Sequence, residues 1–352
     1  MAQRHLDPTD RPTAEVVTAH ALEGYLRAQA TEFLRALRLH RVTGGSSAGG
    51  ADGAVDAARA LRRSARRISG SLHTFRPLLD PGWAEEMRPE LAWLSGTLGL
   101  EHAYESRLER LLLALHRLSG AAVFPAQAVT AAAVAAADPA PAPERGNLTV
   151  GAAKAGALLE RQLTLARTRA HSTALQALGS ARFHAVADKV AVLASEVPLT
   201  PAAATTDPSP LAAAARERLT DAVAALPLVT AGHPYNAEAL VHGLSPGPSP
   251  HPQDGPWHQV RLLLRLHRYA REALYADGAP VDVRLVAAGQ ALDRHRDAAE
   301  AAGAAAQAAR TPRIAPATAY ALGVLHADQR HEVEAARFAF QRAWQKQTVD
   351  VP

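Results

Sequence analysis

Residues 56–80 read DAARALRRSARRISGSLHTFRPLLD, and the interpretation of the whole chain starts from this stretch. With about 100° between successive residues of an α-helix, its basic residues fall within a sector roughly 140° wide. They form the first basic row: Arg59, Arg62, Arg63, Arg66, Arg67 and His73. The opposite side of the helix carries Leu61, Ala65, Ile68, Leu72 and Phe75. The stretch therefore predicts an amphipathic helix whose polar face has a single sign of charge.

Like charges one helical turn apart repel each other by a few tenths of a kcal/mol per pair. A solvated helix face normally relieves this repulsion with interleaved acidic residues. Here no acidic residue lies between Asp56 and Asp80. An anionic partner is the simplest compensation for the first basic row.

A second basic stretch, WHQVRLLLRLHRYAREALY, covers residues 257–275. Its basic residues at i, i+3, i+7 and i+10 form the second basic row: His258, Arg261, Arg265 and Arg268. Glu272 lies on the same face and can pair with Arg268 at i+4. If the two rows faced each other, they would form a cationic groove for a linear polyanion.

The composition of the 352-residue chain favours helices, because alanine is abundant and aromatic residues make up only 5%. Helical periodicity predicts helices over nine ranges: 14–41, 55–76, 83–118, 150–178, 181–196, 210–226, 257–276, 280–308 and 316–346. No convincing period-2 pattern indicates a strand, so we expect an all-α protein of antiparallel helical bundles.

Four segments rich in Gly, Pro or Ser predict the main connections: 44–54, 135–149, 198–210 and 229–256. In each half of the chain a basic helix is followed by another helix. This echo predicts a single domain over 1–352 with two pseudo-symmetric halves, 10–197 and 205–350, around a central basic groove or pore.

Lysine and arginine together number 38 against 34 acidic residues, and only three of the 38 are lysine. The chain has no cysteine, which excludes a disulfide scaffold, a Cys-ligated metal and a thiol nucleophile. No apolar run is long enough for a membrane span, and the N-terminus does not resemble a secretory signal. We therefore expect a cytoplasmic protein. Its oligomeric state does not follow from the sequence.

Catalytic motifs are weak. The chain lacks GxxxxGK[ST], GxGxxG and GxSxG, which disfavours enzymes built on a nucleotide cradle or a nucleophile elbow. His295 and Asp297 point about 200° apart on a helix, so they do not share a metal ion. His258 could act as a phosphoacceptor, which leaves a phosphotransferase or phosphohydrolase as an alternative. We expect no cofactor and no metal.

Nucleic acid is a second alternative ligand, because its phosphates carry the same charge. Recognition of bases usually requires stacking aromatic side chains or a helix that enters a groove. Residues 59–73 contain no aromatic residue, and Tyr269 is the single candidate for stacking in the second stretch. A polyanion without bases fits an aromatic-free row better.

Several motifs together resemble the CHAD family, the conserved-histidine α-helical domain. The first is Arg59-x-x-Arg62-x-x-x-Arg66-Arg67 running into Leu72-x-x-Phe75-Arg76-Pro77-Leu78-Leu79. Others are Glu90-Leu91-x-Trp93-Leu94, Trp257-His258-x-x-Arg261, Arg268-Tyr269-Ala270, His295-x-Asp297-Ala298 and Ala335-x-Arg337-Phe338. The chain differs from the family in having Arg59 where the family's first histidine falls.

The resemblance implies two helical bundles whose basic residues line a groove or pore that binds inorganic polyphosphate without catalysis. On that basis we expect both basic rows to contact polyphosphate through charge-assisted hydrogen bonds. Neighbouring helices add three further candidates: Arg182, Lys189 and Arg337. The same resemblance makes association with polyphosphate granules an expectation.

Overall fold

The computed structural model describes residues 19–43, 50–120, 143–228, 251–275 and 282–345, together with residues 232 and 244. Within these ranges the only β-pairing is an isolated bridge between Leu79 and Leu199, and the rest of the regular structure is helical. The predicted all-α class is confirmed. Most of the connections predicted at 44–54, 135–149 and 229–256 lie outside the described residues.

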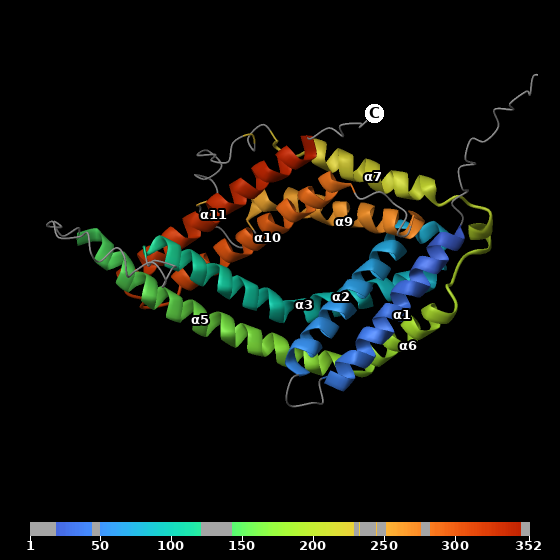
Figure 1. The fold of residues 1–352 in the computed structure, drawn as a ribbon, viewed down its shortest axis with the longest axis horizontal. Coiled ribbons are helices and arrows are strands. Elements are labelled where there is room, and N and C mark those ends of the chain that lie inside the picture. The colour runs from blue at the N-terminus through green and yellow to red at the C-terminus, as the bar shows by residue number, and fades with distance from the viewer. Residues whose placement is uncertain are drawn as a thin grey trace, which may run out of the picture. The chain divides into compact units, whose positions relative to one another are not determined.

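The helices expected from periodicity are all present in the described part of the chain (Figure 1). They are α1 (Ala19–Thr43), α2 (Gly50–Thr74), α3 (Pro81–Leu118), α5 (Pro143–Leu178), α6 (Ala181–Ser195), α7 (Ser209–Ala224), α9 (Gly255–Tyr275), α10 (Val283–Ala309) and α11 (Pro316–Gln345). Short 3-10 helices are η1 (Arg76–Leu78), η2 (Pro201–Ala204) and η4 (Pro252–Asp254). The largest difference in bounds is at α5, which begins at Pro143 rather than near 150.

Side-chain caps account for the starts of two of these helices. The Asp80 carboxylate accepts a 2.7 Å hydrogen bond from the backbone N–H of Trp83, and Pro81 occupies the first position of α3. Asp282 accepts hydrogen bonds from the backbone N–H groups of Arg284 and Leu285 at the start of α10. Both caps satisfy backbone donors that the first helical turn leaves without a partner.

The chain divides into two compact units. The first consists of Met1–Ala92, Val186–Ala215 and His267–Ala279, and the second of Trp93–Ala185, Arg216–Leu266 and Pro280–Pro352. Helices α3, α6, α7 and α9 contribute residues to both units. Each unit is described separately below.

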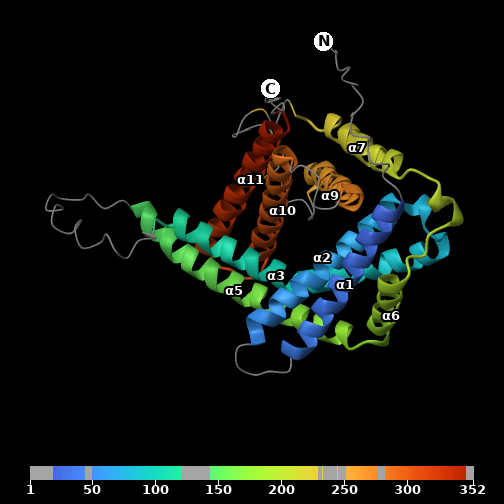
Figure 2. The same cartoon turned by 45° about the vertical axis from the view of Figure 1, so that its right-hand side comes forward.

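In the first unit, α1 and α2 lie side by side as an antiparallel pair (Figures 1 and 2). Leu22, Leu26 and Phe33 on α1 are fully buried, as are Leu61 and Ile68 on α2. Burying these side chains stabilises the pair, since each contributes about 1.5–3 kcal/mol relative to exposure. The apolar face predicted for residues 56–80 is therefore confirmed.

In the second unit, α10 and α11 lie side by side and α5 packs against α11 (Figures 1 and 2). One apolar cluster joins α3, α5, α10 and α11, and another joins α7, α9, α10 and α11. Ala301, Ala305 and Ala308 of α10 are fully buried in the first cluster. Such small side chains let helices approach closely, which suits a core poor in aromatic residues.

No helix among the described residues is both long and apolar enough to cross a membrane. The two halves expected at 10–197 and 205–350, and their pseudo-symmetric arrangement around a groove, stay predictions. The first basic row belongs to the first unit, whereas the second row is divided: His258, Arg261 and Arg265 belong to the second unit and Arg268 to the first.

Candidate functional site

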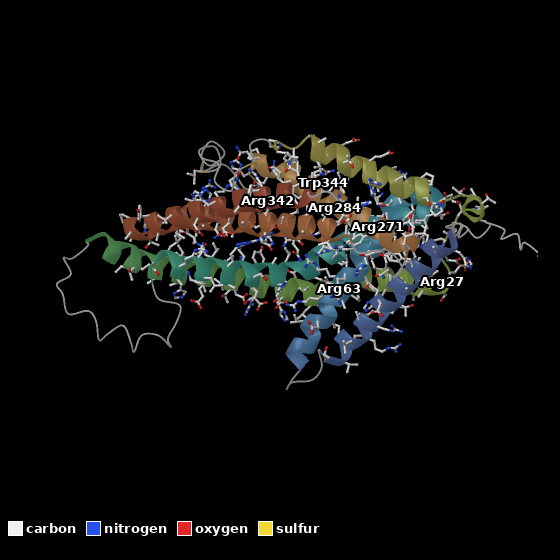
Figure 3. All side chains as sticks on the ribbon, turned by 45° about the horizontal axis from the view of Figure 1, so that its top comes forward. Arg27, Arg63, Arg271, Arg284, Arg342 and Trp344 are labelled. Atoms are coloured by element: carbon white, nitrogen blue, oxygen red, sulfur yellow. The ribbon has the colours of Figure 1, made fainter. Side chains whose placement is uncertain are left out.

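The first basic row lies on α2, in the first unit. The apolar side chains opposite it, Leu61, Ala65, Ile68, Leu72 and Phe75, are all 0% exposed. The basic side chains are exposed at Arg59, Arg63 and His73 and half-buried at Arg62, Arg66 and Arg67. Arg63 is labelled in Figure 3. The amphipathic character expected of this helix is therefore confirmed.

Glu272, near the end of α9, contacts both rows within the first unit. Its Oε2 accepts a 2.8 Å hydrogen bond from Nε of Arg67 and a 3.2 Å hydrogen bond from the Tyr25 hydroxyl. Its Oε1 lies 3.3 Å from Nε of Arg268. One carboxylate thus joins an arginine of the first row to an arginine of the second.

The Tyr269 ring lies beside the same two arginines. The Arg67 and Arg268 guanidinium carbons are 6.0 and 5.4 Å from its centroid, distances at which a cation is attracted to an aromatic face. Burial acts to lower the pKa of Arg67, but the hydrogen bond and charge of Glu272 outweigh it, so the pKa is raised. Arg67 therefore keeps its charge despite being half-buried.

In the second unit, the carboxylate of Asp293 on α10 holds two arginines of the second row. Its Oδ1 accepts a 2.6 Å hydrogen bond from Nε of Arg261, and Nη2 of the same arginine lies 2.5 Å away. Nη2 of Arg265 donates to the same oxygen over 3.3 Å. A single carboxylate is therefore shared by two guanidinium groups.

Arg296 is a third arginine at this place, and the sequence analysis did not identify it. It pairs with Asp297 and lies 3.7 Å from Glu300, which also accepts a 2.5 Å hydrogen bond from Arg107. Arg296 lies three residues after Asp293 on α10, a spacing that places both residues on one helix face. This spacing is the feature of the sequence from which Arg296 could have been identified.

The arginines of this group repel each other. Burial, followed by the charges of Arg265 and Arg296, lowers the pKa of Arg261 to about 10, although Asp293 acts in the opposite direction. Arg261 is still protonated at neutral pH. The positive charges of Arg265 and Arg296 thus disfavour the charged form of Arg261 in addition to the larger effect of burial.

His258, the first residue of the second row, is half-buried in the second unit. Burial lowers its pKa below the ordinary 6.5; Asp254 opposes this shift, and Arg261 and Arg296 add to it. Its Nε2 has no hydrogen-bond partner among the residues that the structure describes. At neutral pH His258 is therefore an uncharged imidazole beside cationic neighbours.

Arg337 lies in a buried network of ion pairs rather than on an exposed basic face. It is 5% exposed. Its guanidinium donates to Glu334 over 2.6 Å, to Asp254 over 2.7 Å and to the Gln253 carbonyl over 3.0 Å. Arg330 donates to the same Asp254 over 2.8 Å. These contacts account for the charge of Arg337, and we do not include it in the binding surface proposed below.

The other two candidates outside the rows lie on α6. The exposed Arg182, in the second unit, has its guanidinium 4.0 Å from the centroid of the Trp93 ring. Lys189, in the first unit, donates to Glu86 over 2.6 Å. Nothing in these contacts tests whether either residue binds a ligand.

The structure thus joins Arg67 to Arg268 in one unit and Arg261 to Arg265 in the other. Arginine presents a rigid fork of N–H donors that matches the oxygens of carboxylates and phosphates. Among the described residues, no group of three or more histidine or acidic side chains is arranged to hold a metal ion. These arginine groups have the donors needed to bind oxyanions.

Comparison with known proteins identifies the class. The family model for the CHAD domain matches residues 28–306, and the chain belongs to that family. Among solved structures, the chain is similar to PptA from Streptomyces chartreusis. The two are 70% identical, the match covers 94% of this chain and 99% of that one, and the TM-score is 0.76. No curated protein matches.

Proposed function

We propose that this protein binds inorganic polyphosphate through its two basic rows and does not catalyse a reaction on it. The observation that carries the proposal is that Arg261 and Arg265 share the single carboxylate of Asp293, while the charge of Arg296 also acts on Arg261. A further anion placed beside these arginines would relieve their mutual repulsion. Membership of the CHAD family supports the same ligand class.

The aromatic side chains near the rows favour polyphosphate over nucleic acid. Phe75 is fully buried, and Tyr269 is 7% exposed with two guanidinium groups beside its ring. Neither of these two rings is accessible for stacking on a base, which is the usual contact in the binding of single strands. Tyr275, which is 48% exposed, lies seven residues after Arg268, the last residue of the second row. Polyphosphate has no bases and requires only the oxygen contacts that arginine provides.

The absence of catalysis is part of the proposal. For His258 to attack phosphorus, a nearby carboxylate would normally accept or direct its proton. The carboxylate whose charge acts most strongly on His258 is Asp254, and its oxygens accept hydrogen bonds from Arg330 and Arg337. We expect no shortening of polyphosphate when the protein is incubated with it and Mg²⁺ or Mn²⁺. Time-dependent release of phosphate would contradict this part of the proposal.

The first basic row can be tested with Arg62→Ala combined with Arg66→Ala. We expect affinity for long-chain polyphosphate to fall several-fold per arginine, because each substitution removes charge-assisted hydrogen bonds. Helix content should be unchanged, since alanine is the stronger helix former. Isothermal titration calorimetry and circular dichroism measure the two quantities.

A matched control is Arg38→Ala combined with Arg41→Ala, which removes the same charge from exposed positions on α1. The control should bind nearly as the wild type does. If the α2 variant binds long-chain polyphosphate as tightly as the wild type, the row has been assigned wrongly. Competition with RNA at fixed salt distinguishes the nucleic-acid alternative.

We also propose a cytoplasmic location with association with polyphosphate granules. Fractionation of cells grown with and without phosphate would test it. The protein should move into the granule fraction when granules accumulate.

A further inference from the structure

Two carboxylates contact arginines of the basic rows through ion pairs and hydrogen bonds. Phosphate oxygens could take the place of the carboxylate oxygens in these contacts. In the first unit, Glu272 accepts a hydrogen bond from Arg67 and pairs with Arg268. In the second unit, Asp293 accepts hydrogen bonds from Arg261 and Arg265. Each carboxylate uses guanidinium donors that an oxyanion ligand would also need.

Both carboxylates are accessible to water. The side chain of Glu272 is 29% exposed and that of Asp293 is 53% exposed. Asp254, which also accepts from two arginines, is only 2% exposed. A partly exposed ion pair contributes less stability than a buried one, so Glu272 and Asp293 can leave their partners at lower cost than Asp254 can.

We propose that Glu272 and Asp293 are built-in competitors that set the selectivity of the rows for long polyanions. This inference rests on the function proposed above. An anion with few phosphates must displace a carboxylate to reach Arg67, Arg268, Arg261 or Arg265, and it makes few other contacts to offset the cost. A long chain also contacts the other arginines of the rows, so the same displacement removes a smaller share of its contacts.

The test uses Glu272→Gln combined with Asp293→Asn, which keeps the shape of both side chains and removes their charge. The probes are tripolyphosphate and long-chain polyphosphate, titrated calorimetrically at two salt concentrations. We expect tripolyphosphate to bind about tenfold more tightly to the double variant, or about threefold per carboxylate. Affinity for the long chain should rise by about threefold or less, so selectivity for length falls.

The matched control is Glu32→Gln combined with Asp221→Asn, which changes net charge equally. Glu32 pairs with Arg35 on α1, outside both rows, and Asp221 is exposed on α7. Thermal unfolding establishes that both double variants fold. The control should change the affinity for either probe less than twofold.

The outcomes separate the inference from the proposed function. If the wild type binds the long chain and the Glu272–Asp293 variant gains no more tripolyphosphate affinity than the control, the inference is wrong and the function stands. If the wild type fails to bind the long chain while the variant gains tripolyphosphate binding, the function is wrong and the competing role of the carboxylates is supported. If neither protein binds either probe, both are overturned.

Discussion

At the scale of single residues, the most constrained titratable group is His295 on α10. It is 1% exposed, its ring stacks on Trp257 with centroids 5.6 Å apart, and its Nε2 accepts a 3.3 Å hydrogen bond from Arg337. Burial lowers the pKa of His295 from 6.5 to about 4, although Asp254 acts in the opposite direction. The folded protein therefore holds this imidazole neutral.

This pKa predicts how stability depends on pH. Between pH 6.5 and 4 the unfolded chain protonates His295 while the folded chain does not, so stability falls as the pH falls through this window. The contribution amounts to about 3 kcal/mol when the pH has reached 4. Thermal unfolding midpoints measured from pH 7 to pH 4.5 should show the decline.

The variant His295→Gln isolates this contribution, because glutamine does not titrate. Burial raises the pKa of Glu334, which makes the protein more stable as the pH falls, and lowers the pKa of His258, which makes it less stable. Both residues are present in the wild type and in the variant. The variant should be less stable than the wild type at pH 7 and should lose less stability on acidification. If the unfolding midpoints of the two proteins fall equally as the pH is lowered, the role given to His295 is wrong.

At the scale of helices, α5 and α11 approach each other closely in the second unit at Gly151. A Cβ at Gly151 would lie 2.2 Å from the backbone oxygen of Ala317 and 3.4 Å from Cβ of Ala321. Backbone atoms cannot move aside as a flexible side chain can. The absence of a side chain at Gly151 therefore permits this contact.

We predict that Gly151→Ala destabilises the protein by about 1–3 kcal/mol, since α5 and α11 must separate to admit the methyl group. This is opposite to the intrinsic preference of helices, which favours alanine over glycine by about 1 kcal/mol. Gly323→Ala on α11 is the control, because nothing lies within 4 Å of a Cβ there. Thermal unfolding should give a lower midpoint for the first variant and an equal or higher one for the second. The opposite order would refute the packing argument.

At the scale of the whole molecule, the chain carries 38 basic side chains of lysine and arginine against 34 acidic ones, so binding depends on where the charges lie. A polyanion that contacts about four row arginines releases the counterions condensed on it. By analogy with single-stranded nucleic acids, raising salt from about 50 to about 200 mM should then weaken binding roughly 50-fold. Titration with long-chain polyphosphate at several salt concentrations measures the slope. If the slope of log affinity against log salt concentration is near zero, charge does not dominate the binding of polyphosphate.

Much of the fold was predictable, because the helices follow a clear apolar period and the motifs in both halves of the chain resemble one family. The buried face of α2, including Leu61, Ile68 and Phe75, matched the pattern of the sequence. The placement of Arg337 was not predictable, since its partner Asp254 lies 83 residues away along the chain. Helical spacing shows which residues share a face, but it does not show which distant carboxylate turns toward them.

The same limit applies to the acidic partners of the rows. No acidic residue lies between Asp56 and Asp80 in the sequence, yet Glu272 contacts Arg67 from 205 residues away. The pairing between Arg261 and Asp293 joins two helices and was also not expected. Such long-range pairs decide how much positive charge a row presents, and only coordinates reveal them.

The two basic rows consist of arginine and histidine and contain no lysine. Acetylating enzymes and amine-reactive reagents neutralise the lysine ammonium group, and the guanidinium of arginine is not their target. Acylation therefore has no site in either row at which to switch the charge off. If the proposed function holds, release of a bound chain is left to ionic strength, to competing anions or to degradation of the chain by other enzymes.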